Sequence, residues 1–324
     1  MMQRNVVMAS QIPLAHVSSK KRIGHHVSMA KGISNAVVNA KNIGATAFAL
    51  FVRTPRTWKS KPLADVEIAK WKTLLQTPLK AVDGDKQTDV EFSYSYDHIL
   101  PHGSYLANLG SSDDEKRAKS LELFKEELSI CNSLGIKMLN IHPGSAKKDI
   151  TKEKCIQLIA QSINSAFEEI TDVKVVLENT AGGGGTIGQK FQEIADLIEL
   201  ITDKNRVGVC LDTCHMFAAG YDIRTKIKFD TVMEDFDNTV GFKYLCGMHL
   251  NDSKSDLGSK LDRHENLGKG KIGMECFRII MNDNRFDNIP LILETPMGGQ
   301  KEEIELLYSL EGQQPPPIDI EAIA

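Results

Sequence analysis

The stretch VGVCLDTCHMFAAGYD at residues 207–222 begins with an apolar run and then places Asp212 and His215 three positions apart, ahead of a glycine. The apolar run has the length and composition of a buried β-strand. Burying a carboxylate or an imidazole without a partner costs several kcal/mol. The stretch therefore indicates a buried strand whose end delivers polar side chains to a partner.

The same pattern recurs along the chain. Apolar, β-branched runs alternate with charged amphipathic stretches, of which 113–135, 152–170 and 189–201 are the clearest helix candidates. Strands that alternate with helices pair in parallel through right-handed crossovers. Because eight consecutive units favour closure over an open doubly wound sheet, we predict a single-domain α/β fold, a (β/α)8 TIM barrel. The eight strand candidates are 23–29, 46–52, 99–106, 137–144, 173–180, 206–213, 243–250 and 289–296.

The barrel is expected to span residues 23–310. Residues 1–22 are polar and basic and are predicted to form a flexible leader. The segment 81–98 is predicted to be a long loop before the third strand. The tail 311–324 contains three consecutive prolines and is predicted to be disordered.

Composition and charge narrow the class of protein. The 324 residues are 41% hydrophobic and 25% charged, and no apolar run approaches the roughly 20 residues of a membrane span, so no membrane association is expected. Six cysteines without CxxC pairs indicate a reducing, intracellular compartment. Residues 1–64 contain ten bases and no acid, although the net charge is −4. Such a segment binds a polyanion if its bases share a face.

Polar side chains stand at the C-terminal ends of six successive predicted strands. In a barrel these ends converge on one rim, where active sites lie. The following loop adds Asp262 and His264, which an extended backbone points to the same side. Each residue alone would be explained by packing or helix capping, but their coincidence predicts a metal site. The residues at the strand ends are His102, His142, Glu178, Asp212 with His215, His249 and Glu294.

The chemistry of these nine residues indicates the kind of metal site. Imidazoles and carboxylates without thiolates suit zinc or manganese in a hydrolytic site rather than structural zinc. Nine ligands are too many for one ion with an open position, so two or three ions are expected. Cys214 is expected to pack rather than to bind metal. On a continuing strand Asp212 and His215 face opposite sides, so either the chain turns after Asp212 or the two residues serve different ions.

The sequence resembles the endonuclease IV family, the zinc-dependent apurinic/apyrimidinic endonucleases, over residues 22–310. That family folds as a (β/α)8 barrel with three metal ions. Its members usually have alanine where His25 stands, so His25 is not expected to be a ligand. The resemblance rests, in family order, on IGHHVSMAKGI (23–33), LPHGSYLANLG (100–110), NIHPGS (140–145), LENTAG (177–182), LDTCHMFAAGYD (211–222), HLNDSK (249–254), DRHENLGKGKIG (262–273) and LETP (293–296).

The resemblance implies three zinc sites, with manganese as an alternative in one of them. One zinc would bind His102, His142 and the shared Glu178. The second would bind Glu178, Asp212, His249 and Glu294, and the third His215, Asp262 and His264. Glu178, Asp212 and Glu294 are the expected catalytic residues.

The resemblance also implies contacts with DNA. Arg56 would insert into DNA at the lesion, and Tyr105 and Leu106 would enter the opposite gap. Trp58, in the basic loop 53–61, and Lys254 are further candidates for contact with DNA. For Trp58, packing against the barrel rim is an equal alternative.

The implied activity is base excision repair. The enzyme would hydrolyse the phosphodiester 5′ to an abasic site in duplex DNA, leaving a 3′-hydroxyl and a 5′-deoxyribose phosphate, and would remove blocking groups from 3′ ends. A monomer is expected, in the nucleus or the mitochondrion of a eukaryote or in the cytoplasm of a bacterium.

Two other functions remain open. A metal-dependent sugar isomerase would use Glu178, Asp212, His249 and Glu294, but it leaves the other ligand candidates without a purpose. A non-catalytic protein that binds abasic sites would need no metal ligands.

Overall fold

Six of the predicted strands form one parallel sheet, in the order β2-β11-β8-β7-β6-β5. The computed structural model describes residues 11–147 and 149–313. Parallel bridges join His26 to Ala49, Phe48 to Ile99 and His102 to Asn140, so the predicted second and third strands complete the ring between β2 and β5. The (β/α)8 barrel is thereby confirmed. The strands are β2 (Arg22–His25), β5 (Met138–Ile141), β6 (Lys174–Glu178), β7 (Val207–Asp212), β8 (Leu245–His249) and β11 (Pro290–Leu293).

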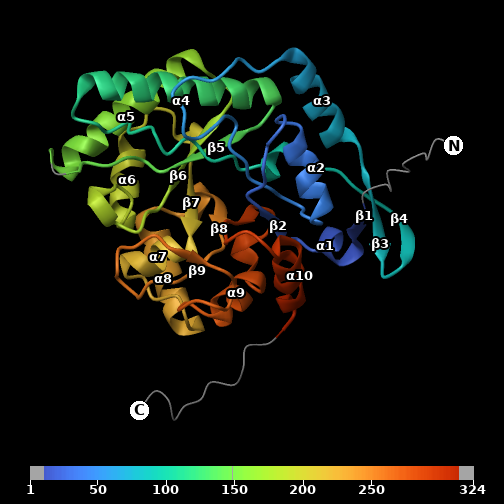
Figure 1. Ribbon diagram of the computed structural model, residues 1–324. Coiled ribbons are helices and arrows are strands. Elements are labelled where there is room, and N and C mark those ends of the chain that lie inside the picture. The colour runs from blue at the N-terminus through green and yellow to red at the C-terminus, as the bar shows by residue number, and fades with distance from the viewer. Residues whose placement is uncertain (1–10, 148, 314–324) are drawn as a thin grey trace, which may run out of the picture.

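Helices surround the barrel strands (Figure 1). The three predicted helices are confirmed as α4, α5 and α6, and α4 is typical: the Asp113 side chain accepts the Lys116 N–H at its start, and Gly135 ends it at φ 80°. No helix among the described residues is long and apolar enough to cross a membrane. The helices are α1 (Leu14–Ser18), α2 (Asn35–Asn42), α3 (Asp65–Gln76), α4 (Asp114–Leu134), α5 (Lys152–Glu169), α6 (Phe191–Leu200), α7 (Thr213–Ala219), α8 (Lys226–Thr239), α9 (Met274–Met281) and α10 (Gln300–Leu310).

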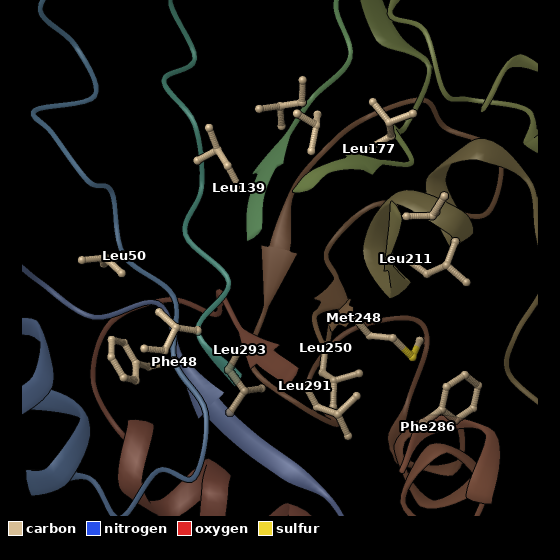
Figure 2. Packing of buried hydrophobic residues seen from close by; sticks show 14 of the residues in the cluster. Phe48, Leu50, Leu139, Leu177, Leu211, Met248, Leu250, Phe286, Leu291 and Leu293 are labelled. Atoms are coloured by element: carbon tan, nitrogen blue, oxygen red, sulfur yellow. The ribbon is translucent and has the colours of Figure 1, made fainter. Parts of the chain in front are cut away.

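Alternate residues of each barrel strand pack on opposite sides of the sheet. Leu177, Leu211 and Leu291 belong to the large apolar cluster that also contains residues of the surrounding helices (Figure 2). Their neighbours in the strands form a second, smaller cluster. Because both faces are buried, the strands read as continuous apolar runs. The smaller cluster consists of Ala47, Ala49, Leu100, Met138, Val176, Cys210 and Ile292.

Close approach of two strands depends on Gly24 in β2. A Cβ atom at this position would collide with the carbonyl oxygen of Ala47. The segment around Ala47 pairs with the end of β2 through the bridge between His26 and Ala49. Glycine therefore lets the second barrel strand pack directly against the first.

The prediction of a loop at 81–98 is wrong for most of that segment. β3 (Leu79–Asp83) and β4 (Lys86–Phe92) form an antiparallel hairpin whose turn contains Gly84 at φ 57°. β3 also pairs in parallel with β1 (Gln11–Pro13), giving a separate sheet of order β1-β3-β4. An Asp-Gly pair between strands is a hairpin signal, but the mostly exposed residues of β4 mask it in the sequence.

The prediction of a flexible leader is wrong from residue 11 onward. Ile12 and His16 are buried, and His16 Nδ1 lies 2.9 Å from the carbonyl oxygen of Gly44. The Lys21 side chain is 2% exposed, and its Nζ atom lies 2.8 Å from Asp287 Oδ1. These contacts join the start of the described chain to distant segments. Residues 1–10, and residues 314–324 of the tail 311–324 that was predicted to be disordered, lie outside the described residues.

Candidate metal centre

The candidate ligands at the strand ends continue the inward-facing register of the barrel. Each of three carboxylates stands two residues after a member of the smaller apolar cluster, so it lies on the same side of its strand. The interior of the barrel thus changes from apolar to charged at the carboxyl end of the sheet. The pairs are Val176 with Glu178, Cys210 with Asp212 and Ile292 with Glu294.

The chain turns at Asp212, which ends β7 and precedes α7. Asp212 Oδ1 accepts a hydrogen bond of 2.9 Å from the backbone N–H of His215. This N-cap brings the His215 side chain round to the same rim. Of the two explanations that the sequence left open, the turn after Asp212 is observed, and Asp212 and His215 also fall into different groups of potential ligands.

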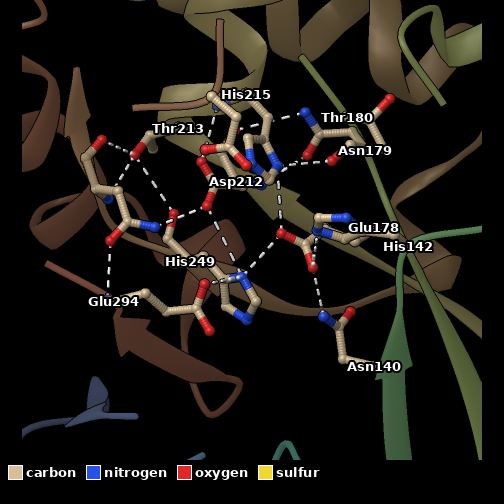
Figure 3. Close-up of polar contacts among 12 residues, drawn as sticks. Asn140, His142, Glu178, Asn179, Thr180, Asp212, Thr213, His215, His249 and Glu294 are labelled. Atoms are coloured by element: carbon tan, nitrogen blue, oxygen red, sulfur yellow. Dashed lines mark hydrogen bonds and ion pairs between the residues drawn. The ribbon is translucent and has the colours of Figure 1, made fainter. Parts of the chain in front are cut away.

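Glu178 lies at the centre of the rim and is fully buried (Figure 3). Its Oε2 lies 3.2 Å from His102 Nε2 and 3.5 Å from His142 Nε2. Its Oε1 lies 3.0 Å from His249 Nδ1. The two oxygens of one carboxylate therefore face two different sets of imidazoles, as a carboxylate shared by two cations would.

The other ligand candidates complete two further groups. His249 Nδ1 lies 3.3 Å from Glu294 Oε2 and 3.8 Å from Asp212 Oδ2. The two oxygens of Asp262 each lie 3.1 Å from an Nε2 atom, one of His215 and one of His264. In each group the potential ligand atoms lie within 4.8 Å of one another. The three groups of imidazoles and carboxylates are His102, His142 and Glu178; Glu178, Asp212, His249 and Glu294; and His215, Asp262 and His264; a fourth group, which includes a thiol, contains Asp212, Cys214 and His264.

The orientation of the imidazoles fits bound cations. The Nδ1 atoms of His102, His215 and His264 lie 2.7, 2.9 and 3.1 Å from backbone carbonyl oxygens. Donation from Nδ1 leaves the Nε2 lone pair free to bind a metal. The buried Nε2 atoms of His215 and His264 make no hydrogen bond, although Asp262 oxygens lie 3.1 Å away. Buried nitrogens are rarely left without a hydrogen bond, so the two Nε2 atoms fit the role of metal ligands.

Electrostatics favours the same conclusion. Burial would lower the pKa of His215, but Asp212 and Asp262 raise it well above its usual value. Burial likewise opposes the charged form of His264, and Asp212 with Asp262 nevertheless raises its pKa to about 9. Burial would raise the pKa of Glu178, but His249 and His142 hold it well below its usual value. Cations would replace the protons on these imidazoles, so metal binding would release protons.

Three asparagines support the acidic ligands, and sequence reasoning missed all of them. Asn140 Nδ2 donates to Glu178 Oε2 at 2.5 Å, and Asn251 Nδ2 donates to Asp212 Oδ2 at 2.7 Å. Asn179 Oδ1 accepts the backbone N–H of Asp212 at 2.6 Å. The sequence feature that could have identified these asparagines is their position inside the motifs NIHPGS, HLNDSK and LENTAG. Such contacts orient ligating carboxylates.

The loop that carries Asp262 and His264 is held by a buried carboxylate. β9 (Asp252–Ser253) and β10 (His264–Glu265) form a short antiparallel pair. The Asp252 carboxylate accepts the backbone N–H groups of Ser253, Gly270, Ile272 and Gly273. The segment after β10 is thereby fixed against β9, which positions the third group of ligands.

The residues predicted to contact DNA lie around this rim. Tyr105 is 57% exposed, so it is not a core aromatic, and its ring centroid lies 4.8 Å from that of His102. Arg56 is exposed, and Leu106 is half-buried. Trp58 is half-buried, with Lys119 Nζ 4.2 Å from its ring centroid, so it packs on α4. Lys254 Nζ lies 4.0 Å from Glu265 Oε2.

The bases of residues 1–64 do not all share a face. Lys21, Lys41 and Arg53 are buried, and the Lys41 ammonium donates to the carbonyl oxygens of Leu74 and Thr77. The exposed bases include three that line an open groove of about 980 Å³, together with His26 and Phe51. The ring centroid of Phe51 lies 5.8 Å from that of His102, so the groove adjoins the ligand groups. The three bases are Lys31, Lys59 and Lys61.

Two further residues bear on the ligand set. The Cys214 thiol lies near Asp212 and His264, and burial raises its pKa to about 12. This keeps Cys214 a neutral thiol, and its role as a packing residue stays a prediction. His25 belongs to none of the potential ligand groups among the described residues.

The chain is similar to a known protein family, to curated relatives and to solved structures. The family model for the xylose isomerase-like TIM barrel matches residues 37–310. A probable endonuclease 4 from Campylobacter fetus is 50% identical over 275 residues, which cover 85% of this chain and 93% of the relative. The crystal structure of endonuclease IV from Thermus thermophilus matches with a TM-score of 0.73 at 32% identity, covering 89% of this chain and 98% of that one. A D-tagatose 3-epimerase-like protein matches with a TM-score of 0.65 at 14% identity, covering 89% of this chain and 96% of that one, which indicates a shared fold alone.

Proposed function

The chain belongs to the endonuclease IV family of xylose isomerase-like TIM barrels, and from that premise we propose that it is a metal-dependent DNA repair endonuclease. Its substrate is duplex DNA that contains an abasic site. It hydrolyses the phosphodiester 5′ to that site and leaves a 3′-hydroxyl and a 5′-deoxyribose phosphate. The same centre removes blocking groups from 3′ ends. The enzyme acts as a monomer.

The observation that carries this proposal is the position of Glu178. Its two carboxylate oxygens face different imidazole sets, and the third group around Asp262 lies alongside. Adjacent cations suit phosphoryl transfer, in which charge develops on the attacking and the departing oxygen at once. Three zinc ions, or two with manganese in one site, match the donor set of imidazoles and carboxylates.

When bound, these cations supply Lewis-acid stabilisation of the phosphate and activation of the attacking water. The residues of the chain hold and orient the ligands. Asn140 fixes one oxygen of Glu178, and Asn251 fixes one oxygen of Asp212. The carbonyl oxygen of Glu294 holds His264 at Nδ1, which keeps Nε2 directed at the site. Glu178, Asp212 and Glu294 are the proposed catalytic carboxylates.

The rim supplies the contacts with DNA. Exposed Arg56 and Tyr105 enter the duplex at the lesion, and Leu106 follows Tyr105 into the gap. A missing base lowers the cost of unstacking, which favours abasic over intact DNA. Lys31, Lys59 and Lys61 in the adjacent groove neutralise phosphates. Lys254 adds a further contact, whereas Trp58 mainly supports the loop through its packing with Lys119.

The two rival functions are less well supported. A sugar isomerase would use the group of Glu178, Asp212, His249 and Glu294. It gives no reason for the Nε2 atoms of His215 and His264, which face Asp262 but make no hydrogen bond. A protein that only binds abasic sites needs neither this ligand group nor the group of His215, Asp262 and His264.

The test is incision of a labelled duplex with one abasic site by the purified protein, with and without a strong chelator. We expect a single cut 5′ to the site, loss of incision with the chelator and recovery with added zinc. An otherwise identical intact duplex is the control. Incision that survives chelation, or isomerisation of a keto sugar without incision, would overturn the proposal.

A further inference from the structure

Two loops at the rim carry the residues proposed to enter DNA, and both are attached to helix α4. The Arg56 loop comprises residues 53–60, and the Tyr105 loop comprises residues 103–106. Neither loop contains α-helix or extended strand. The backbone N–H of Gly103 donates to the carbonyl oxygen of Asn140 at 2.8 Å at the start of the Tyr105 loop. Beyond such backbone bonds, side-chain contacts determine where the exposed residues of the two loops point.

The Arg56 loop is held at both ends by Glu126 of α4. Arg53 Nη1 donates to Glu126 Oε2 at 2.8 Å, and Ser60 Oγ donates to Glu126 Oε1 at 2.7 Å. Arg53 also closes the loop, because its Nη2 donates to the carbonyl oxygen of Thr57 at 3.1 Å. Arg53 is 3% exposed, so this charged pair lies partly out of water and is stronger than a surface pair. Arg56 lies exposed between the two anchors.

The Tyr105 loop is held by the next residue of α4, Glu127. The buried Glu127 accepts the Ser104 N–H at Oε1 over 2.9 Å. The Ser104 hydroxyl accepts the Leu106 N–H at 3.3 Å and donates to the carbonyl oxygen of Pro55 at 2.6 Å. Pro55 belongs to the Arg56 loop, so the two loops are also bonded directly to each other.

These contacts make one rigid unit from two separate loops. Glu126 and Glu127 are neighbours on a 21-residue helix, which resists bending. The distance between the two sets of DNA-inserting residues is therefore set by α4 and by the Ser104–Pro55 bond. Groups held in place before binding lose less entropy on binding, which increases affinity for the ligand that needs both groups together.

We propose that Glu126 and Glu127 are positioning residues for recognition of the abasic site, and this inference rests on the proposed function. Glu126 sets the Arg56 loop, Glu127 sets the Tyr105 loop, and Ser104 couples them. Neither residue belongs to a potential metal ligand group among the described residues, so we assign the pair to the selection of damaged DNA rather than to the chemistry at the cations.

The test compares variants of the metal-loaded full-length enzyme. Glu126→Gln removes the ion pair with Arg53. Glu127→Ala removes the acceptor for Ser104, whereas Glu127→Gln keeps an amide oxygen in its place. Glu122→Gln is the matched control, because Glu122 is on the same helix, is 76% exposed and lies 3.9 Å from Lys125.

Three readouts separate positioning from general stability. Affinity is measured for a duplex with a tetrahydrofuran abasic analogue and a phosphorothioate at the 5′ linkage, and for the matched intact duplex. KM and kcat are measured on the cleavable duplex. Hydrogen exchange is measured over residues 53–60 and 103–106 without DNA.

We expect Glu126→Gln and Glu127→Ala to weaken binding to the abasic duplex and to raise KM by about tenfold. This corresponds to the loss of about one hydrogen bond that fixes each loop. Binding to the intact duplex, kcat and metal content should stay within about twofold, and both loops should exchange faster. Glu127→Gln should restore most of the affinity, and Glu122→Gln should match wild type.

Equal loss of affinity for abasic and intact duplex, or a fall in kcat at constant KM, would overturn the inference. Unchanged hydrogen exchange in both loops would overturn it as well. If the wild-type protein fails to incise abasic DNA, the proposed function is wrong, and hydrogen exchange alone then decides whether the two residues fix the loops.

Coupling between the loops has its own check. Ser104→Ala removes the bond to Pro55 while keeping the backbone N–H that Glu127 accepts. Combined with Glu126→Gln, it should give an effect on abasic affinity that departs from the sum of the single effects, since both changes act on one unit. Additive effects would contradict the coupling.

Discussion

Asp212 Oδ1 accepts the backbone N–H of His215 at 2.9 Å, so the residue that ends β7 also caps α7. Its other oxygen, Oδ2, faces His249 at 3.8 Å and His264 at 3.6 Å. One carboxylate thus shapes the turn with one oxygen and faces two groups of candidate ligands with the other. The two roles are separable by substitution.

Asp212→Asn should keep the cap, because asparagine is as good an N-cap residue as aspartate, and should lose the anionic ligand. Asp212→Ala should lose both and should be less stable than Asp212→Asn by about 1 kcal/mol. Both should reduce incision by at least about 100-fold, because losing a metal ligand lowers activity more than losing a group that only orients a ligand. Denaturant unfolding and incision assays measure these effects, and equal stability of the two variants would argue against the capping role.

Glu178→Gln should change metal content more than His142→Ala does. Glu178 belongs to two of the potential ligand groups, and His142 belongs to one. We therefore expect loss of up to two ions per chain in the first variant and of one in the second, measured by elemental analysis after dialysis against dilute zinc. Equal losses would mean that Glu178 is not shared.

Glu127 gives the stability of the protein a pH dependence. Burial raises the pKa of Glu127 from 4.5 to about 7, although the Ser104 N–H opposes the change. Between these pH values the folded protein holds a proton that the unfolded chain has released, so stability falls as pH rises through this window. Above pH 7 the full loss of stability from ionising the buried Glu127 is reached, and it amounts to about 3 kcal/mol.

Glu127→Gln removes this cost and keeps an acceptor for Ser104. The variant should be more stable than wild type at pH 8, by up to about 3 kcal/mol, and the difference should shrink toward pH 4.5. Denaturant unfolding of both proteins across this range provides the measurement. A variant that is less stable than wild type at pH 8 would show that the Glu127 carboxylate is stabilised by its surroundings.

Arg56→Ala should weaken binding to an abasic duplex by about tenfold without changing metal content, because an exposed arginine at an interface can contribute a large share of affinity. Lys80→Ala is a suitable control: Lys80 pairs with Glu91 in the separate three-stranded sheet. Fluorescence anisotropy measures the affinities. If both variants bind equally well, Arg56 does not enter the duplex.

The barrel could be predicted because its strands are short apolar runs at regular spacing, a property local to each stretch. The rim could be predicted because residues such as Glu178 and Glu294 follow those runs directly, and closure of the barrel then brings them together. The family resemblance, confirmed by the relatives, supplied the grouping of the ligands.

The features that were missed depend on contacts between distant residues. Ile12 is buried because β1 pairs with β3, which lies far along the chain. Glu126 reads as a surface residue of an amphipathic helix until Arg53, 73 positions earlier, is placed beside it. Such pairings depend on tertiary packing and leave no periodic signal in the sequence.

The proposed function requires nine side chains to hold a set of neighbouring cations that act on DNA. Native mass spectrometry of the purified protein, with an incision assay on the same sample, tests it most directly. We expect up to three divalent ions per chain, and loss of incision in step with their removal. At most one ion per chain in fully active protein would contradict it.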